Sequence, residues 1–324
     1  MTALPILKFE PLLKSIVWGG RNLNTVLNRT LPTDEPFGES WEICDLPGNQ
    51  SVVTSGPYGG VSIETLIERY QYQMLGSASL LEGRFPLLFK FIDAQQTLSV
   101  QVHPDSLACR ALGQGARPKT EAWYIIDARP DATLYVGLRD GVTRGQFENA
   151  LEAGTVASLL HEKQVSRGDY VFLPSGTVHA IGAGIVLAEV QQSSNTTYRV
   201  FDWNRMGLDG RPRALHMEEA LASIHFNQSG EPEVTPPQSG RKGVRCEYFS
   251  METVRLDKGD SVTFQSSGPV AVMCTSGNGV AEIQSMADAV HAMCGETVFI
   301  PACQSSHITI GANAPIEMVV TLIP

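Results

Sequence analysis

The chain has 324 residues, of which 43% are hydrophobic and 18% are charged, and its formal net charge is -10 at pH 7. This length allows two domains with buried cores, and the composition is that of an ordinary globular enzyme. The acidic balance argues against a broad nucleic-acid interface, which needs a basic face, whereas a small anionic substrate needs only a few local donors.

The sequence carries no signal for a membrane span, for export or for disulfides. Its apolar runs are shorter than a membrane-spanning helix, and residues 1–20 mix Lys, Glu and Pro into their apolar residues, unlike a signal peptide. The six cysteines form no CxxC pair and lie at positions 44, 109, 246, 274, 294 and 303. We interpret them as free thiols of a reducing compartment and expect a cytoplasmic protein without membrane or nucleic-acid partners.

Short segments typical of β-strands follow one another through most of the chain. Bounded by turn residues, they are in chain order FPLLFKFID (85–93), TLSVQVH (97–103), EAWYIID (121–127), TLYVGL (133–138), DYVFLP (169–174), GIVLAEVQQ (184–192) and TYRVFDW (197–203). Fewer helices are expected: at 62–74, directly after Pro104, from Thr143, whose spacing to Gln146 resembles a capping box, and at 215–225. We therefore predict a mostly β chain of jelly-roll or β-barrel domains with a few short helices.

One segment has the composition of a linker between two domains. Residues 227–243, NQSGEPEVTPPQSGRKG, are rich in Pro, Gly and polar residues and have no apolar period. They divide the chain into a larger unit, 1–226, and a smaller unit, 244–324.

A weak internal repeat suggests that one β-domain design is used twice. GDYVFLP (168–174) and GETVFIP (295–301) share their glycine, an acidic residue, a Val-Phe pair and the proline. The alternative is that a glycine, strand and proline recur by chance in a β-rich chain. In the second copy Ser306 stands where the first has His179, so we expect the C-terminal unit to be structural and without a metal.

The first copy of this repeat continues into a candidate metal-binding motif. Residues 168–181, GDYVFLPSGTVHAI, follow the pattern G-x5-P-x-G-x2-H, in which glycine turns flank a strand and His179 points inward at a barrel mouth. This pattern resembles the second motif of the cupin superfamily, and the two predicted β-domains are accordingly expected to be cupin-like. A single inward histidine is more often a structural residue than a ligand, so further ligands are needed.

Two further segments supply the additional candidate metal ligands. In TLSVQVH the side chains alternate, so Gln101 and His103 leave the same face of an extended strand, as neighbouring ligands of one metal do. Glu121 begins another strand and offers a carboxylate. With His179 these residues form a mixed nitrogen and oxygen set that suits Zn2+, although iron, manganese or cobalt are alternatives.

The same segments carry a narrower resemblance. The usual first cupin motif is HxH followed shortly by Glu, whereas here Gln101 replaces the first His and Glu121 lies well beyond His103. SVQVHPD (99–105) and KTEAWY (119–124) instead resemble the type I mannose-6-phosphate isomerases, especially the shorter bacterial members. So do PLLKSIVWGG (11–20), GESWE (38–42), FPLLFKFIDA (85–94), PSGTVHAIGAG (174–184) and EVQQSSNTTYRVFDWNR (189–205).

The resemblance covers about residues 8–225 and implies an aldose–ketose isomerase. Its members interconvert D-mannose 6-phosphate and D-fructose 6-phosphate, and we expect a reaction through an enediol or enediolate stabilised by one Zn2+ per chain. The implied metal ligands are Gln101, His103, Glu121 and His179; the implied catalytic residues are Arg199 and Lys90; and the implied substrate-binding residues are Ser99 and Lys119.

The properties of the individual residues, taken without the resemblance, support these implied roles only in part. Lys90 lies in the apolar run LLFKFI, where burial is expected to depress its pKa and fit it for proton transfer, but a structural ion pair is an alternative. Ser99 shares the face of Gln101 and His103. Without the resemblance, Arg199 is better interpreted as a surface or ion-paired arginine, and Lys119 as a solvated lysine.

Three other functions remain open at this stage. The first is an isomerase of another sugar phosphate. The second is a carbohydrate-binding cupin without activity. The third is an iron-dependent cupin oxygenase, in which the segments GESWE and TYRVFD have no place.

Overall fold

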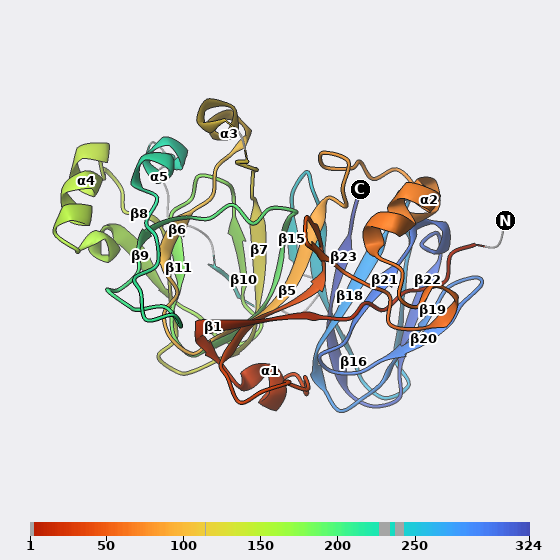
Figure 1. The fold of residues 1–324 in the computed structure, drawn as a ribbon. Helices are drawn as coiled ribbons and strands as arrows, with labels where there is room; N and C mark the ends of the chain where they lie inside the picture. Colours follow the sequence, from red (N-terminus) through yellow and green to blue (C-terminus); the bar gives the residue numbers. More distant parts are fainter. Residues whose placement is uncertain (1–2, 114, 227–233, 237–242) are drawn as a thin grey trace.

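The computed structural model describes residues 3–113, 115–226, 234–236 and 243–324. These residues fold mostly into β-strands arranged as two pairs of packed sheets, joined side by side (Figure 1). The predicted fold class is therefore confirmed. Most of the predicted linker 227–243 lies outside the described residues, so the domain boundaries stay a prediction.

The first pair of sheets carries the residues that the sequence singles out. Its seven-stranded sheet has the order β1 (Leu12–Gly20), β2 (Phe37–Ile43), β5 (Leu87–Ala94), β12 (Ile185–Gln192), β7 (Glu121–Ala128), β10 (Tyr170–Leu173) and β14 (Val234–Thr235). Its five-stranded sheet has the order β13 (Tyr198–Phe201), β6 (Val100–Val102), β11 (His179–Ile181), β8 (Thr133–Leu138) and β9 (Leu160–Gln164).

The central strands of the seven-stranded sheet are buried on both faces. Successive side chains of a strand point to opposite faces, and here the two faces enter different cores. On β7, Trp123 and Ile125 pack into the core between the first two sheets. Tyr124 and Ile126 pack into the core shared with the C-terminal sheets. This double burial explains why β5, β7 and β12 are continuously apolar apart from a few charged residues.

The second pair of sheets is formed by the C-terminal part of the chain. A five-stranded sheet has the order β15 (Gly243–Arg245), β16 (Ser250–Leu256), β23 (Ile316–Leu322), β18 (Val270–Gly277) and β21 (Thr297–Ile300). A four-stranded sheet has the order β17 (Ser261–Phe264), β22 (Ile308–Ala312), β19 (Ala281–Gln284) and β20 (Ala289–Ala292). Their facing side chains make a separate aliphatic core.

The two copies of the sequence repeat form corresponding strands. Each copy starts at a glycine with a left-handed backbone, Gly168 (φ 93°) and Gly295 (φ 85°), and then enters β10 or β21. A residue with a Cβ atom is disfavoured at this φ, which accounts for the glycine in both copies. In the second copy Ser306 and His307 are exposed.

The N-terminal residues pack on the C-terminal sheets rather than on their own neighbours in sequence. Figure 1 shows the red N-terminal segment that leads into β1 beside the blue strands. Leu7 and Phe299 exchange two backbone hydrogen bonds of 2.8 Å, and Gln304 donates from Nε2 to the Leu4 carbonyl at 2.8 Å. The first residues of the chain therefore help to join the two halves of the molecule.

Helices are few and short. The α-helices are α1 (Asn22–Thr25), α2 (Ile63–Leu75), α3 (Ser106–Leu112), α4 (Arg144–Glu152) and α5 (Met217–Ser223), and the 3-10 turns are η1 (Gly56–Tyr58), η2 (Val156–Leu159) and η3 (Ala302–Gln304). The four predicted helices are found, and the capping box of Thr143 and Gln146 is present. Helix α1 was not predicted, and α5 is shorter than 215–225 because Ile224 adopts an extended backbone.

Two smaller features complete the fold. A two-stranded ribbon joins β3 (Asp45–Leu46) to β4 (Asn49–Gln50). All six cysteines are free thiols, as predicted. Within the described ranges, every helix is too short or too polar to cross a membrane.

The aromatic contact between the two halves leads to a stability prediction. Phe299 is fully buried, and its ring centroid lies 5.5 Å from that of Phe85 and 6.0 Å from that of Phe9. Replacing Phe299 with Ala should lower the free energy of unfolding by about 3–5 kcal/mol, measured by urea denaturation. The control Tyr72→Ala, at an 83% exposed position, should change it by less than about 0.5 kcal/mol. Equal effects of the two substitutions would contradict this account of the core.

Candidate active site

A cavity of about 530 Å³ lies between the two N-terminal sheets. This volume is ordinary for a small-molecule site. Among the described residues that line it, the charged ones are Lys14, Glu39, Lys90, Lys119, Glu189, Arg199 and Arg213. Cations outnumber carboxylates there, although the whole chain is acidic, so the cavity favours an anionic ligand.

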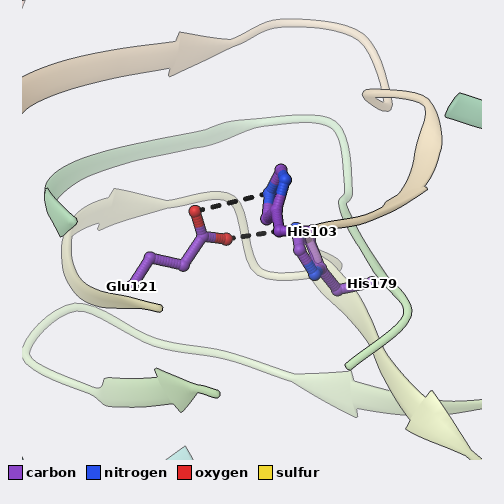
Figure 2. A group of neighbouring side chains, drawn as sticks. All are labelled: His103, Glu121 and His179. Carbon is purple, nitrogen blue, oxygen red and sulfur yellow. Dashed lines mark ion pairs between the residues drawn. The ribbon is translucent and has the colours of Figure 1, made fainter. Parts of the chain in front are cut away.

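A buried cluster beside the cavity, in contact with its lining residues Gln101 and Lys119, could hold a metal ion. Ligand atoms of His103, Glu121 and His179 all lie within 4.8 Å of one another (Figure 2). Glu121 Oε1 lies 3.1 Å from His179 Nε2, and Glu121 Oε2 lies 3.6 Å from His103 Nε2. The three residues come from different strands: His103 directly follows β6, Glu121 begins β7 and His179 begins β11.

Backbone carbonyls fix how the two imidazoles present their nitrogens. His103 Nδ1 donates to the Thr196 carbonyl at 2.8 Å, and His179 Nδ1 donates to the Thr177 carbonyl at 3.0 Å. A carbonyl oxygen can only accept, so the proton of each neutral ring is on Nδ1. Each Nε2 therefore directs a lone pair toward Glu121, the arrangement typical of metal-ligating histidines.

The surroundings keep His103 and Glu121 in their metal-binding protonation states. Burial, assisted by the charge of Lys119, holds the pKa of His103 well below its usual range. Burial alone would raise the pKa of Glu121, but Lys119 and the two imidazoles hold this pKa well below its usual range. At neutral pH the imidazole of His103 is therefore uncharged and Glu121 is a carboxylate, as metal ligation requires.

The contacts of Glu121 indicate that the cluster fits a cation. Both carboxylate oxygens are buried and accept no well-aligned hydrogen bond from the part of the chain that the structure describes. The ammonium of Lys119 lies 2.6 Å from Glu121 Oε2 and 3.1 Å from His103 Nε2, so a positive charge is attracted to this position. Two nitrogen donors and a carboxylate suit a divalent metal of the zinc type.

Gln101, the fourth predicted ligand, lies beside this cluster. Its Nε2 is 3.3 Å from His179 Nε2, and its Oε1 accepts a hydrogen bond from Ser99 Oγ at 3.3 Å. The amide presents its nitrogen rather than its oxygen to the histidine, so it would have to rotate to ligate a metal. Its role as a ligand stays a prediction.

Lys90 lines the cavity, but its electrostatic state differs from the expectation. Its Nζ lies 2.9 Å from Glu189 Oε1 and 3.7 Å from Glu39 Oε2. Burial alone would lower the pKa of Lys90, but these two carboxylates raise it above its usual value. The predicted depression of the Lys90 pKa was wrong, because β12 brings Glu189 directly opposite Lys90 in the sheet register.

Glu189 is a site residue that the sequence reasoning missed. Its Oε2 accepts a hydrogen bond of 2.9 Å from Trp123 Nε1, so the carboxylate is held from two sides. The signal was present in GIVLAEVQQ, where one acidic residue interrupts an apolar strand. Such a carboxylate is expected to be paired when buried, and its pairing identifies Lys90 as its partner.

Arg199 and Ser99 lie together on the cavity wall beside Gln101. Arg199 Nε donates to Ser99 Oγ at 3.2 Å, and Arg199 Nη1 donates to the Ala214 carbonyl at 2.9 Å. Lys119, in contrast, lies within the Glu121 cluster. Lys14 and Arg213 also line the cavity and were not singled out by the sequence, because neither belongs to a recognisable motif.

Removing a histidine of the cluster should abolish metal binding. We expect His179→Ala and His103→Ala to lower the affinity for Zn2+ at least about 10-fold, because each loses a nitrogen donor. The bound metal per chain after dialysis, measured by elemental analysis, tests this. His291→Ala, at an exposed position far from the cluster in sequence, is the control and should bind like the unmodified protein. Unchanged metal content in His179→Ala would remove this cluster as the metal site.

Comparisons with known proteins agree with this architecture. Residues 6–132 match the family model for the catalytic domain of type I phosphomannose isomerase. Mannose-6-phosphate isomerase ManA of Bacillus subtilis is 40% identical over 257 residues, which are 78% of this chain and 79% of that protein. A mannose-6-phosphate isomerase of Streptococcus mutans is 40% identical over 205 residues, 63% of each chain.

Solved structures agree as well. The crystal structure of the mannose 6-phosphate isomerase from Bacillus subtilis matches with a TM-score of 0.85 and 26% identity, covering 98% of this chain and 99% of that one. A putative mannosephosphate isomerase from Archaeoglobus fulgidus shares the fold, with a TM-score of 0.80 at 20% identity over 100% of this chain and 99% of that one. The chain therefore belongs to the type I phosphomannose isomerase family.

Proposed function

We propose that this protein is an isomerase that interconverts D-mannose 6-phosphate and D-fructose 6-phosphate. The observation that carries the proposal is the buried cluster of His103, Glu121 and His179 beside a cationic cavity. A metal site alone would fit many reactions, and a cationic pocket alone would fit many anions. Their combination in a member of this family supports a sugar phosphate as the substrate.

The chemistry requires stabilisation of negative charge at one end of the sugar. An aldose–ketose isomerisation moves a proton between carbon 2 and carbon 1 through an enediol or enediolate. One Zn2+ held by His103, Glu121 and His179, with Gln101 as the proposed fourth ligand, would supply Lewis-acid stabilisation of that charge. The neighbouring strands exclude water, which strengthens electrostatic interactions within the site.

Lys90 is the proposed proton-transfer residue. Because Glu189 and Glu39 favour its charged form, it enters the reaction as an ammonium and can donate a proton to a substrate oxygen. After that donation, its neutral amine can accept the proton of carbon 2 and return it to carbon 1, and the proton released by the hydroxyl on carbon 2 restores the ammonium. Glu189 holds the Lys90 side chain in place through both steps.

Arg199, Ser99 and Lys119 are proposed to hold the substrate. Lys119 lies at the metal end of the cavity, beside Glu121 and His103, so we assign it to the oxygens of the reacting end. Ser99 and Arg199 are bonded to each other, and Ser99 also donates to Gln101 beside the cluster, so we assign them to the remainder of the sugar phosphate. Binding at both ends would orient the reacting carbons.

The direct test is turnover of the purified protein. We expect conversion of mannose 6-phosphate to fructose 6-phosphate that is lost after treatment with a chelator and restored by Zn2+. A coupled assay of fructose 6-phosphate measures it, with mannose and other hexose phosphates as comparison substrates. Absence of turnover by protein shown to contain Zn2+ would overturn the proposal.

Substitution of Lys90 tests its role. Lys90→Arg preserves the positive charge beside Glu189 but cannot release a proton near neutral pH, so kcat should fall about 100- to 10,000-fold with zinc content unchanged. Lys90→Met should be equally inactive, and Lys258→Met, at an exposed lysine, should behave like the unmodified protein. Normal turnover by Lys90→Arg would show that Lys90 transfers no proton.

A further inference from the structure

Four consecutive polar residues are buried next to the metal cluster. Gln191, Gln192, Ser193 and Ser194 are each at most 4% exposed, at the end of β12 and directly after it. Gln191 lies opposite Glu121 in the sheet register. Burying polar side chains is costly unless hydrogen bonds satisfy them, and these four residues do not line the cavity. Their burial therefore calls for a role other than contact with a substrate.

Gln192 holds the backbone on which Glu121 depends. Its N–H donates to the Thr120 carbonyl at 3.0 Å, and its Oε1 accepts a hydrogen bond of 2.9 Å from the Thr120 N–H. Thr120 stands between Lys119 and Glu121, just before β7 begins. Gln192 thus binds both polar groups of the peptide backbone next to two residues of the cluster.

Thr120 extends this connection toward His179. Its Oγ1 lies 3.0 Å from Ser175 Oγ and accepts a hydrogen bond of 3.3 Å from the Ser175 N–H. Ser175 belongs to the short connection between β10 and β11, and β11 begins at His179. Gln192 therefore holds the Glu121 segment directly and the His179 segment through Thr120.

Ser194 holds the carbonyl group that orients His103. Its Oγ accepts a hydrogen bond of 3.1 Å from the Thr196 N–H and donates one of 3.1 Å to the Arg117 carbonyl. Thr196 Oγ1 in turn accepts from the Arg117 N–H at 3.1 Å. The Thr196 carbonyl receives the Nδ1 proton of His103 at 2.8 Å. The orientation of the His103 ring therefore depends on Ser194.

These bonds do the work that a sheet does elsewhere in the fold. Residues 117–120 and 193–197 lie outside the strands, so strand pairing does not fix their backbone. Gln191 shapes the second segment, because its Nε2 donates to the Gln192 and Ser194 carbonyls at 2.9 and 2.7 Å. Buried backbone groups without strand partners need such side-chain bonds.

We propose that Gln192 and Ser194 are positioning residues of the metal cluster, which hold Glu121 and His103 in ligating geometry before a metal binds. Ligands that are fixed in advance bind more tightly, because less conformational freedom is lost on binding. The inference rests on the proposed function for the assignment of the cluster as the metal site, and it is independent of the identity of the sugar.

The test measures the affinity of the metal-free protein for Zn2+ by competition with a chromogenic chelator. For Ser194→Ala and for Gln192→Met we expect the affinity to fall about 10- to 100-fold, although every ligand of the cluster is still present. Ser194→Thr keeps the hydroxyl group and should recover part of the loss.

The C-terminal half offers matched control residues. Ser305 is fully buried and donates toward the Ser266 and Ala302 carbonyls at 3.0 Å each. Gln304 is 4% exposed, as Gln192 is, and donates to the Leu4 carbonyl at 2.8 Å.

These controls separate positioning from a loss of stability. Urea denaturation of the metal-free proteins should show a lower free energy of unfolding for Ser305→Ala and Gln304→Met, as for Ser194→Ala and Gln192→Met, because each variant loses buried hydrogen bonds. The two control variants should bind Zn2+ like the unmodified protein.

The outcomes separate this inference from the proposed function. The inference is overturned if Ser194→Ala and Gln192→Met keep their Zn2+ affinity within twofold, or if the two control variants lose as much affinity. If the affinity falls as expected but the unmodified protein does not turn over mannose 6-phosphate, the positioning role stands and the proposed function fails. Normal turnover with unchanged Zn2+ affinity in both variants has the opposite meaning.

Discussion

The need to balance a buried carboxylate governs the architecture of the site. Glu121 is 1% exposed at the start of β7, where an unpaired negative charge would be strongly destabilising. Two imidazoles and the Lys119 ammonium surround it, and each imidazole is oriented in turn by a backbone carbonyl. The strands β6, β7 and β11 must therefore keep their relative positions, because the charge of Glu121 depends on residues from all three regions.

The remaining charges divide the cavity into two different environments. Lys90 and Lys14, which both lie over the Trp41 ring, balance Glu189 and Glu39, so this part of the cavity is close to electrically neutral. Around Arg199 and Arg213 positive charge exceeds negative charge. A substrate with a dianion at one end and hydroxyl groups at the other would be oriented by this difference, and the surrounding low-dielectric sheets would strengthen the effect.

The sequence predicts features that depend on the local periodicity of side chains. It does not predict features that depend on pairing between strands distant in sequence. The alternation in TLSVQVH predicts that Gln101 and His103 share a face, and the capping box predicts where α4 begins. The pKa direction of Lys90 was wrong because its partner, Glu189, lies on β12, and no local pattern specifies that register. Arg213 has no periodic context at all, since it lies in a loop whose conformation is set by contacts with Asp202.

Contacts between distant parts of the chain also make the position of the site depend on the C-terminal sheets. Glu121 and Trp123 point from β7 toward the cavity, and Tyr124 points from the opposite face into the contact with the C-terminal half. Tyr124 donates a hydrogen bond of 2.8 Å to the Glu317 carboxylate, which Arg255 also binds. A strand anchored on one face cannot shift without moving the residues on the other face. The position of Glu121 is therefore determined jointly by the imidazoles in front of it and by the C-terminal sheet behind it.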